Sequence, residues 1–153
     1  MKKEKDPEIK TVSRNRRAHQ KFSVLETLEA GISLFGHEVK SLRQGKADIE
    51  ESMVRFERGE AFLFNAHIPP YSHLSHVEYQ PTRTRKLLLH RNQIEKLSGQ
   101  AQAKGLAVIP LELYFKHGIA KVTIALAKGK KHEDRREEIK KREADRDMRR
   151  AKG

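Results

Sequence analysis

A chain of 153 residues is long enough for one compact core with flexible ends, and too short for two ordinary domains with linkers. It has no cysteine, which excludes disulfides, thiolate metal sites and cysteine nucleophiles, and it has no apolar run near the roughly 20 residues that span a bilayer, so we expect a cytoplasmic protein. The net charge of +12 is concentrated at the ends, with 8 basic and 3 acidic residues in 1–21 and 12 and 7 in 128–153, which favours a nucleic-acid partner.

The first part of the chain is predicted to be a flexible basic N-terminus, because residues 1–14 mix charges with few apolar side chains. The fold is expected to start near Asn15. An apolar, β-like pattern then predicts a strand over 21–28. We expect a bend at Glu29-Ala30-Gly31, since glycine permits backbone conformations that other residues resist, and a second strand over 32–34.

A short helix and a hairpin are predicted next. Apolar residues three apart over 38–44 indicate one or two helical turns, and Gly45 follows as a stop signal. The alternating segments 52–57 and 61–68 flank Arg58-Gly59-Glu60. A glycine between two such segments is typical of the turn of a β-hairpin.

The remaining elements alternate between loop, strand and helix. The range 71–84 has the histidine, serine and proline content of a long loop, and such loops often carry binding residues. A strand is predicted over 86–89 and a helix over 92–104. The last pair of strands, 106–115 and 119–127, is predicted to form a second hairpin.

Six or so short strands with one clear helix before the last pair predict a mainly β fold with some α structure. We expect an OB-fold-like antiparallel β-barrel with one or two short helices over residues 15–127. A basic C-terminal tail, residues 128–153, completes the chain.

The tail is almost entirely charged, so no face of a helix there could dock on a core. Three acid–base pairs nonetheless have the spacing of four residues that supports a helix by about 0.2–0.5 kcal/mol each: Glu137 with Lys141, Glu138 with Arg142, and Asp145 with Arg149. We therefore predict a disordered tail that becomes helical against RNA. A purely solubilising tail is the alternative.

The sequence offers little for catalysis or metal binding. His73 and His76 are three apart, but they lie in a predicted loop with no third ligand near them in sequence. Adjacent acids such as Glu50 and Glu51 diverge on a strand or helix, whereas paired-carboxylate chemistry needs them to converge. We expect no metal, no cofactor and no enzymatic activity.

Aromatic residues make up only 6% of the chain, and tryptophan is absent. Phe62 and Phe64 share one face of a predicted strand, and Tyr114 and Phe115 lie beside a predicted turn, so core packing takes most of the rings. Too few remain for the stacking platform of a single-strand binder. Recognition should rest on phosphates and shape, which favours structured RNA.

Six runs in register resemble one family, the SsrA-binding proteins. They extend from about Asn15 to Arg136: Asn15-Arg16-Arg17-Ala18, Glu29-Ala30-Gly31-Ile32, Glu38-Val39-Lys40-Ser41-Leu42-Arg43 with Gly45, Gly59-Glu60-Ala61-Phe62-Leu63, Arg83-Thr84-Arg85-Lys86-Leu87-Leu88-Leu89-His90, and Ala127-Lys128-Gly129-Lys130-Lys131. Any single run is weak, but six in order are specific.

The resemblance implies an OB-like barrel that binds the tRNA-like domain of transfer-messenger RNA. It also implies delivery of that RNA to stalled ribosomes for trans-translation, with the tail helical in the empty messenger channel near the decoding region. Elongation factor Tu and alanyl-tRNA synthetase would be reached indirectly, through the RNA. We expect a monomer without membrane contact.

The resemblance also implies particular binding residues. The RNA-gripping set is Glu29, Leu88 and His90 with Lys121 nearby. The wider RNA-binding set comes from the same runs: Asn15, Arg16, Arg17, Lys40, Arg43, Arg83, Arg85, Lys86, Lys128 and Gly129. The residues predicted to meet the ribosome lie in the tail: Lys130, Lys131, Asp134, Arg135, Arg136, Lys140, Lys141 and Arg142.

The residues themselves leave alternatives open. Glu29 could end a strand, or it could accept hydrogen bonds from RNA. In an alternating strand, Leu88 faces opposite to Leu87 and Leu89, so one leucine face is exposed. A generic OB-type binder of single-stranded nucleic acid is the second interpretation, and a small RNA hydrolase using His90 or His132 as a general base is the third.

Overall fold

The computed structural model describes residues 9–71, 78–130 and Arg146. The elements, in chain order, are β1 (Ile9–Arg14), α1 (Ala18–Lys21), β2 (Phe22–Ile32), α2 (Gly36–Arg43), β3 (Met53–Glu57), β4 (Glu60–Phe64), β5 (Arg85–Leu88), α3 (Arg91–Lys104), β6 (Ala107–Lys116) and β7 (Ile119–Gly129). Within these ranges, no helix is long and apolar enough to cross a membrane.

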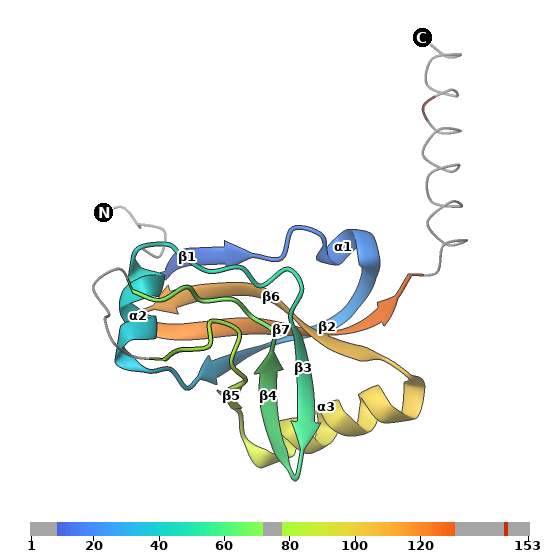
Figure 1. The fold of residues 1–153 in the computed structure, drawn as a ribbon. Coiled ribbons are helices and arrows are strands. Elements are labelled where there is room, and N and C mark those ends of the chain that lie inside the picture. The colour runs from blue at the N-terminus through green and yellow to red at the C-terminus, as the bar shows by residue number, and fades with distance from the viewer. Residues whose placement is uncertain (1–8, 72–77, 131–145, 147–153) are drawn as a thin grey trace, which may run out of the picture.

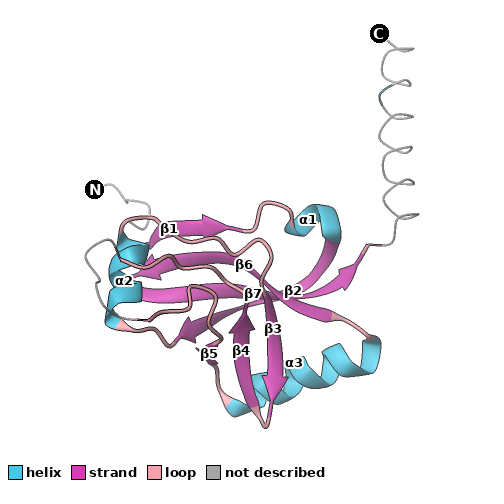
Figure 2. Cartoon of the chain, in the orientation of Figure 1, coloured by secondary structure: helices cyan, strands magenta, loops and turns pink. Residues whose placement is uncertain are grey.

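The seven strands form one antiparallel sheet in the order β1-β6-β3-β4-β5-β2-β7. A further pairing of β6 with β7 closes the six strands from β6 to β7 into a ring, and β1 pairs with β6 outside this ring. The result is a nearly closed ring of strands with the three helices at its periphery (Figure 2). Two of the strand pairings in the ring are short. β3 pairs with β6 only through Val54 and Val108, and β2 pairs with β5 through two residue pairs. The prediction of a mainly antiparallel β fold is confirmed.

Alternating side chains fill the interior of the ring. Val122 and Ile124 of β7, Ala61 and Leu63 of β4 and Leu113 of β6 are all buried in one cluster. Helix α3 packs against β4 and β6 (Figure 1) and adds its two buried apolar residues, Ile94 and Leu97. Their spacing of three residues places them on one face of the helix. The groups on the outer faces of the strands are therefore the ones available for binding.

The predicted flexible N-terminus, residues 1–14, is wrong for residues 9–14. This stretch forms β1 and pairs with residues 112–116 of β6. Its side chains are mostly exposed, so it lacks the apolar alternation that indicates a strand in sequence. Pairing with β6 explains why this stretch forms a strand nonetheless. Without β1, backbone donors and acceptors along the edge of β6 would be left unsatisfied.

The helices and the first bend also differ from the prediction. The described ranges contain three helices rather than one or two, because the four-residue α1 was not predicted. The predicted bend at Glu29-Ala30-Gly31 is absent, since β2 runs through to Ile32. Gly31 has another purpose: a Cβ there would lie 3.2 Å from the Cβ of Leu88, so glycine allows β2 and β5 to approach.

Both predicted hairpins are confirmed. Their turn residues have the left-handed backbone that suits a tight hairpin, with φ of 53° and 76° at Arg58 and Gly59 and of 52° and 76° at His117 and Gly118. β7 continues two residues past the predicted end of the barrel at 127. Most of the predicted tail, residues 131–145 and 147–153, lies outside the described residues.

Candidate nucleic-acid interface

An open groove of about 760 Å³ lies where β2 and β5 meet, bounded by the β3–β4 turn, the start of α3 and part of β7. It brings together five of the residues predicted to bind RNA, which come from three strands and the start of a helix: Glu29, Lys86, Leu88, His90 and Lys121. The rest of the wider predicted set lies elsewhere. The groove is thus the strongest candidate site.

The register of the sheet explains why Leu88 and Lys121 come together. Gly31 of β2 pairs with Leu88 of β5 on one side and with Lys121 of β7 on the other, and Lys121 pairs in turn with Tyr114 of β6. Residues that pair across neighbouring strands project from the same face of the sheet. Leu88, Lys121 and Tyr114 therefore form one row, and Gly31 leaves the row open beside Leu88.

Leu88 is the apolar element of the groove. Along β5, Arg85 and Leu87 point into the core while Lys86 and Leu88 point outward, so Leu87 is 1% exposed and Leu88 is 53% exposed. An exposed leucine between cationic groups suits contact with the apolar parts of a nucleotide. The predicted opposite directions of Leu87 and Leu88 are confirmed, and Leu88 is the one that faces outward.

Glu29 is held as an ionised acceptor on the same face. The Tyr114 hydroxyl donates a hydrogen bond to its Oε2 atom, and the Lys116 ammonium lies 3.6 Å from that oxygen. The hydrogen bond from Tyr114 lowers the pKa of Glu29 against the opposing effect of burial, with help from the charges of Lys116 and Lys121. Burial and the Glu29 carboxylate raise the pKa of Tyr114 to about 12. Both contacts use Oε2, so Oε1 is available to a donor from RNA.

His90 begins helix α3 at the rim of the groove. It occupies the N-cap position, and its backbone N–H donates to the Gln93 Oε1 atom at 2.9 Å. Its side chain is exposed. The unpaired backbone donors of the first turn give this end of a helix a partial positive charge that favours phosphate.

Two arginines in the groove were not predicted. Arg58 lies in the β3–β4 turn and Arg91 in the first turn of α3, and both line the groove. Lys86 differs from them because its ammonium is 2.8 Å from the Glu60 carboxylate, although both side chains are about half exposed. Such a pair is weak enough for a phosphate to compete with it. Only the fold could reveal Arg58, since a turn residue carries no sequence signal for binding.

Arg85 and Asn15 are corrections to the predicted RNA-binding set. The Arg85 side chain is completely buried, and the Asn15 amide donates a hydrogen bond of 2.9 Å to the Pro110 carbonyl inside the protein. Buried polar groups with internal partners are part of the fold. Both side chains are buried and paired within the protein, so we assign both a structural role.

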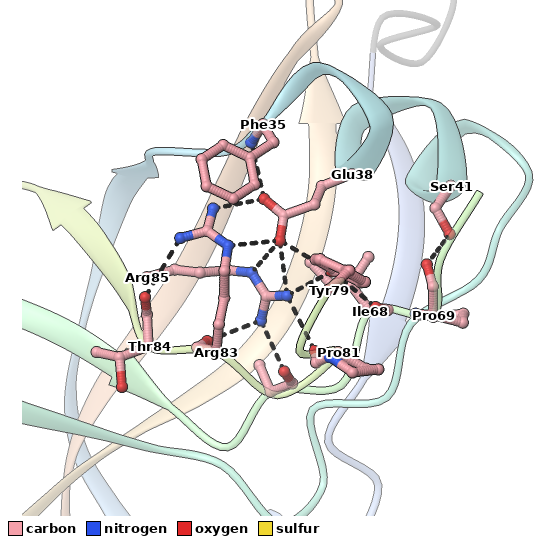
Figure 3. Close-up of polar contacts among 11 residues, drawn as sticks. Phe35, Glu38, Ser41, Ile68, Pro69, Tyr79, Pro81, Arg83, Thr84 and Arg85 are labelled. Atoms are coloured by element: carbon pink, nitrogen blue, oxygen red, sulfur yellow. Dashed lines mark hydrogen bonds and ion pairs between the residues drawn. The ribbon is translucent and has the colours of Figure 1, made fainter. Parts of the chain in front are cut away.

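Arg85 belongs to a buried network around Glu38, drawn in Figure 3. Arg83 donates to both carboxylate oxygens at 2.6 and 2.8 Å, Arg85 donates at 2.9 Å, the Tyr79 hydroxyl at 2.9 Å and the Phe35 backbone N–H at 2.7 Å. Burial raises the pKa of Glu38, but the hydrogen bonds outweigh it and lower the pKa to about 2. Burial and Glu38 raise the pKa of Tyr79 to about 12. The network ties α2 to the start of β5 and so positions the groove residues that follow.

The other predicted cations lie outside the groove. Arg17 pairs loosely with Glu50 at 3.9 Å, and Arg16 is exposed beside it in the chain. On α2, the Lys40 ammonium and the Arg43 guanidinium lie 5.6 and 6.0 Å from the ring centres of Tyr71 and Phe115. These residues could meet RNA only along other faces, which sequence order alone did not reveal.

The start of the tail is partly described. Lys128 and Gly129 are the exposed last residues of β7, and the Lys130 ammonium donates to the His19 carbonyl at 2.9 Å. The other predicted ribosome-contacting residues, Lys131, Asp134, Arg135, Arg136, Lys140, Lys141 and Arg142, lie outside the described residues, as do His73 and His76. Among the residues that are described, no group of three metal-ligating side chains occurs.

The chain matches the model of the SmpB protein family over residues 12–153. The SsrA-binding protein of Pelotomaculum thermopropionicum is 52% identical over 143 residues, 94% of each chain, and that of Desulforudis audaxviator is 51% identical over 147 residues, 96% of this chain and 95% of the relative. A solved structure described as "tmRNA-SmpB: a journey to the center of the bacterial ribosome" contains a chain with a TM-score of 0.67 and 47% identity, covering 82% of this chain and 92% of that one. The predicted resemblance is confirmed: the chain belongs to the SmpB family, the SsrA-binding proteins.

Proposed function

We propose that this chain binds transfer-messenger RNA in trans-translation, and that the groove between β2, β5 and the start of α3 grips the tRNA-like domain of that RNA. The observation that carries the proposal is the convergence of Glu29, Leu88 and Lys121, which are far apart in sequence, on one open face. The chain acts as a binding protein and not as an enzyme.

The chemistry of the groove suits a folded RNA. Lys121 and the start of α3 offer positive charge to phosphates, while the ionised Glu29 carboxylate accepts hydrogen bonds from base or ribose donors. Leu88 supplies an apolar contact between them. We take the nearly closed ring of strands to be an OB-type barrel, a fold whose outer face commonly binds oligonucleotides.

The ribosome is the second proposed partner. The basic tail beyond β7 would order as a helix among the phosphates of the messenger channel and the decoding region. Elongation factor Tu and alanyl-tRNA synthetase would act on the same RNA without touching this chain. The protein would work as a cytoplasmic monomer.

Binding of the tRNA-like domain of transfer-messenger RNA, measured by fluorescence anisotropy, tests the groove. Glu29→Arg and Leu88→Asp should each weaken binding while the protein still unfolds cooperatively, because both side chains lie on the outer face. Glu29→Arg should also lower the melting temperature somewhat, since it removes the partner of Tyr114 and Lys116. Leu25→Asp is the matched control, since Leu25 is 55% exposed on β2 but lies outside the groove. If Leu25→Asp weakens binding as much as Leu88→Asp, the groove is not the site.

Two further readouts separate this function from its alternatives. Affinity for the tRNA-like RNA should fall steeply with salt, with a log–log slope of about −0.7 to −0.9 for each neutralised phosphate. An unstructured oligonucleotide of equal length should compete poorly; if it competes fully, the protein is a generic single-strand binder. The RNA should also remain intact during incubation, whereas cleavage would indicate a hydrolase.

A further inference from the structure

An exposed aromatic ring lies outside the groove, just before α2. Among the described residues, Phe35 is the one aromatic residue that is exposed, with 52% of its surface open. The Arg83 guanidinium lies 3.8 Å from the centre of its ring. Figure 3 shows the ring of Phe35 beside this guanidinium, at the edge of the Glu38 network.

The position of this ring is set by the buried network. The Phe35 backbone N–H donates to Glu38 Oε1 at 2.7 Å, and Arg83 holds both oxygens of the same carboxylate at 2.6 and 2.8 Å. The ring and the cation that lies against it are therefore fixed to one buried group. A ligand that uses a side chain held in this way loses less conformational entropy on binding.

The charge around the ring favours an anionic polymer. Two guanidinium groups, of Arg83 and Arg85, share the single carboxylate of Glu38, so the network keeps a net positive charge. Every nucleobase has a flat face that can stack on an aromatic ring, and an adjacent arginine adds a cation–π contribution. An unpaired RNA base with its phosphate matches both features.

The ring is also close to the groove along the chain. Ser33, just after β2, donates its backbone N–H to the Lys86 carbonyl at 2.9 Å, and Lys86 lines the groove. Phe35 follows two residues later. The segment that carries Phe35 is therefore hydrogen-bonded to the strand that carries Leu88.

We propose that Phe35 and Arg83 form a second RNA contact, in which an unpaired base of the RNA held in the groove stacks on the exposed face of the Phe35 ring. The inference rests on the proposed RNA binding and adds a base-stacking site to it. A single ring is not the multi-ring platform of a single-strand binder. It serves one base at the edge of a folded RNA.

The absence of tryptophan from the chain makes a direct test available. The Phe35→Trp variant contains a single tryptophan, so its fluorescence reports on this position alone when it is excited at a wavelength that tyrosine does not absorb. Titration with the tRNA-like domain of transfer-messenger RNA should quench this emission, saturating together with the anisotropy signal. Ile119→Trp is the control, because Ile119 is exposed in β7 and lies outside the groove. Its emission should stay constant.

An affinity measurement gives the second arm. Phe35→Leu keeps an apolar side chain but removes the ring, so the same RNA should bind about 5- to 150-fold more weakly, which corresponds to about 1–3 kcal/mol for one stacked base. Unchanged emission in Phe35→Trp, equal quenching in Ile119→Trp, or wild-type affinity in Phe35→Leu overturns the inference while the groove function stands. If the wild-type protein fails to bind the RNA at all, both proposals fall.

Discussion

Replacing Glu38 with glutamine tests whether the buried network holds the RNA-binding face together. Glu38 and Arg85 are both completely buried, and the carboxylate also pairs with Arg83. The amide has one acceptor oxygen instead of two and carries no charge, so Arg85 would be left as a buried cation without a counter-ion. Removing one partner of a buried pair costs about 3–5 kcal/mol. We expect Glu38→Gln to lower the free energy of unfolding by about that amount.

The pKa of Glu38 leads to a similar magnitude and adds a pH dependence. The pKa falls from an ordinary 4.5 to about 2 in the folded protein, and each unit corresponds to about 1.4 kcal/mol, so the ionised form gains about 3 kcal/mol from folding. Because the folded-state pKa is the lower one, this stability is present above pH 4.5 and is lost as the pH falls toward 2. The difference between wild type and Glu38→Gln should shrink over that range.

Urea unfolding followed by circular dichroism measures both effects. Glu60→Gln is the matched control, because Glu60 pairs with Lys86 at 2.8 Å where both side chains are about half exposed, and such pairs contribute only about 0–1 kcal/mol. If Glu38→Gln is no less stable than Glu60→Gln at neutral pH, the network does not stabilise the fold. A difference from wild type that is undiminished near pH 2 would refute the assignment of the charge to Glu38.

Three further outcomes are expected. Asn15→Ala should lower the free energy of unfolding by about 1–3 kcal/mol, because it leaves the Pro110 carbonyl without its partner. RNA affinity should stay unchanged. If the variant binds RNA more weakly but is as stable as the wild type, Asn15 contacts RNA as the sequence predicted. Gly31→Val should lower the free energy of unfolding in urea by about 1–3 kcal/mol and weaken RNA binding, because its Cβ would lie 3.2 Å from the Leu88 Cβ. Normal RNA binding by this variant would contradict the close approach of the two strands. Truncation after His132 should leave RNA affinity and melting unchanged but abolish tagging of stalled chains in a translation assay, and normal tagging would show that the tail only solubilises.

The sequence by itself determined most of the secondary structure and one feature of the site. A glycine between two alternating apolar segments was enough to predict each hairpin, because glycine readily adopts the left-handed backbone that a turn such as Arg58-Gly59 requires. Helix α3 was visible from its apolar spacing and from Gly105 at its end. Strand alternation placed Leu88 on the opposite face from Leu87, since successive residues of a strand must face opposite sides, and the structure shows that Leu88 is the exposed one.

Only the tertiary structure decided which polar residues line the groove and which join the buried network around Glu38. Arg83 and Arg85 have the same charge and nearly the same place in the sequence as Lys86, yet both donate to Glu38, more than 40 residues away, while Lys86 lies at the groove. Asn15 is likewise buried, and its amide donates to the carbonyl of Pro110 in a distant strand. Local patterns report which side of an element a residue occupies, whereas burial and pairing depend on what the rest of the chain brings against it, and that is set only when the ring of strands closes.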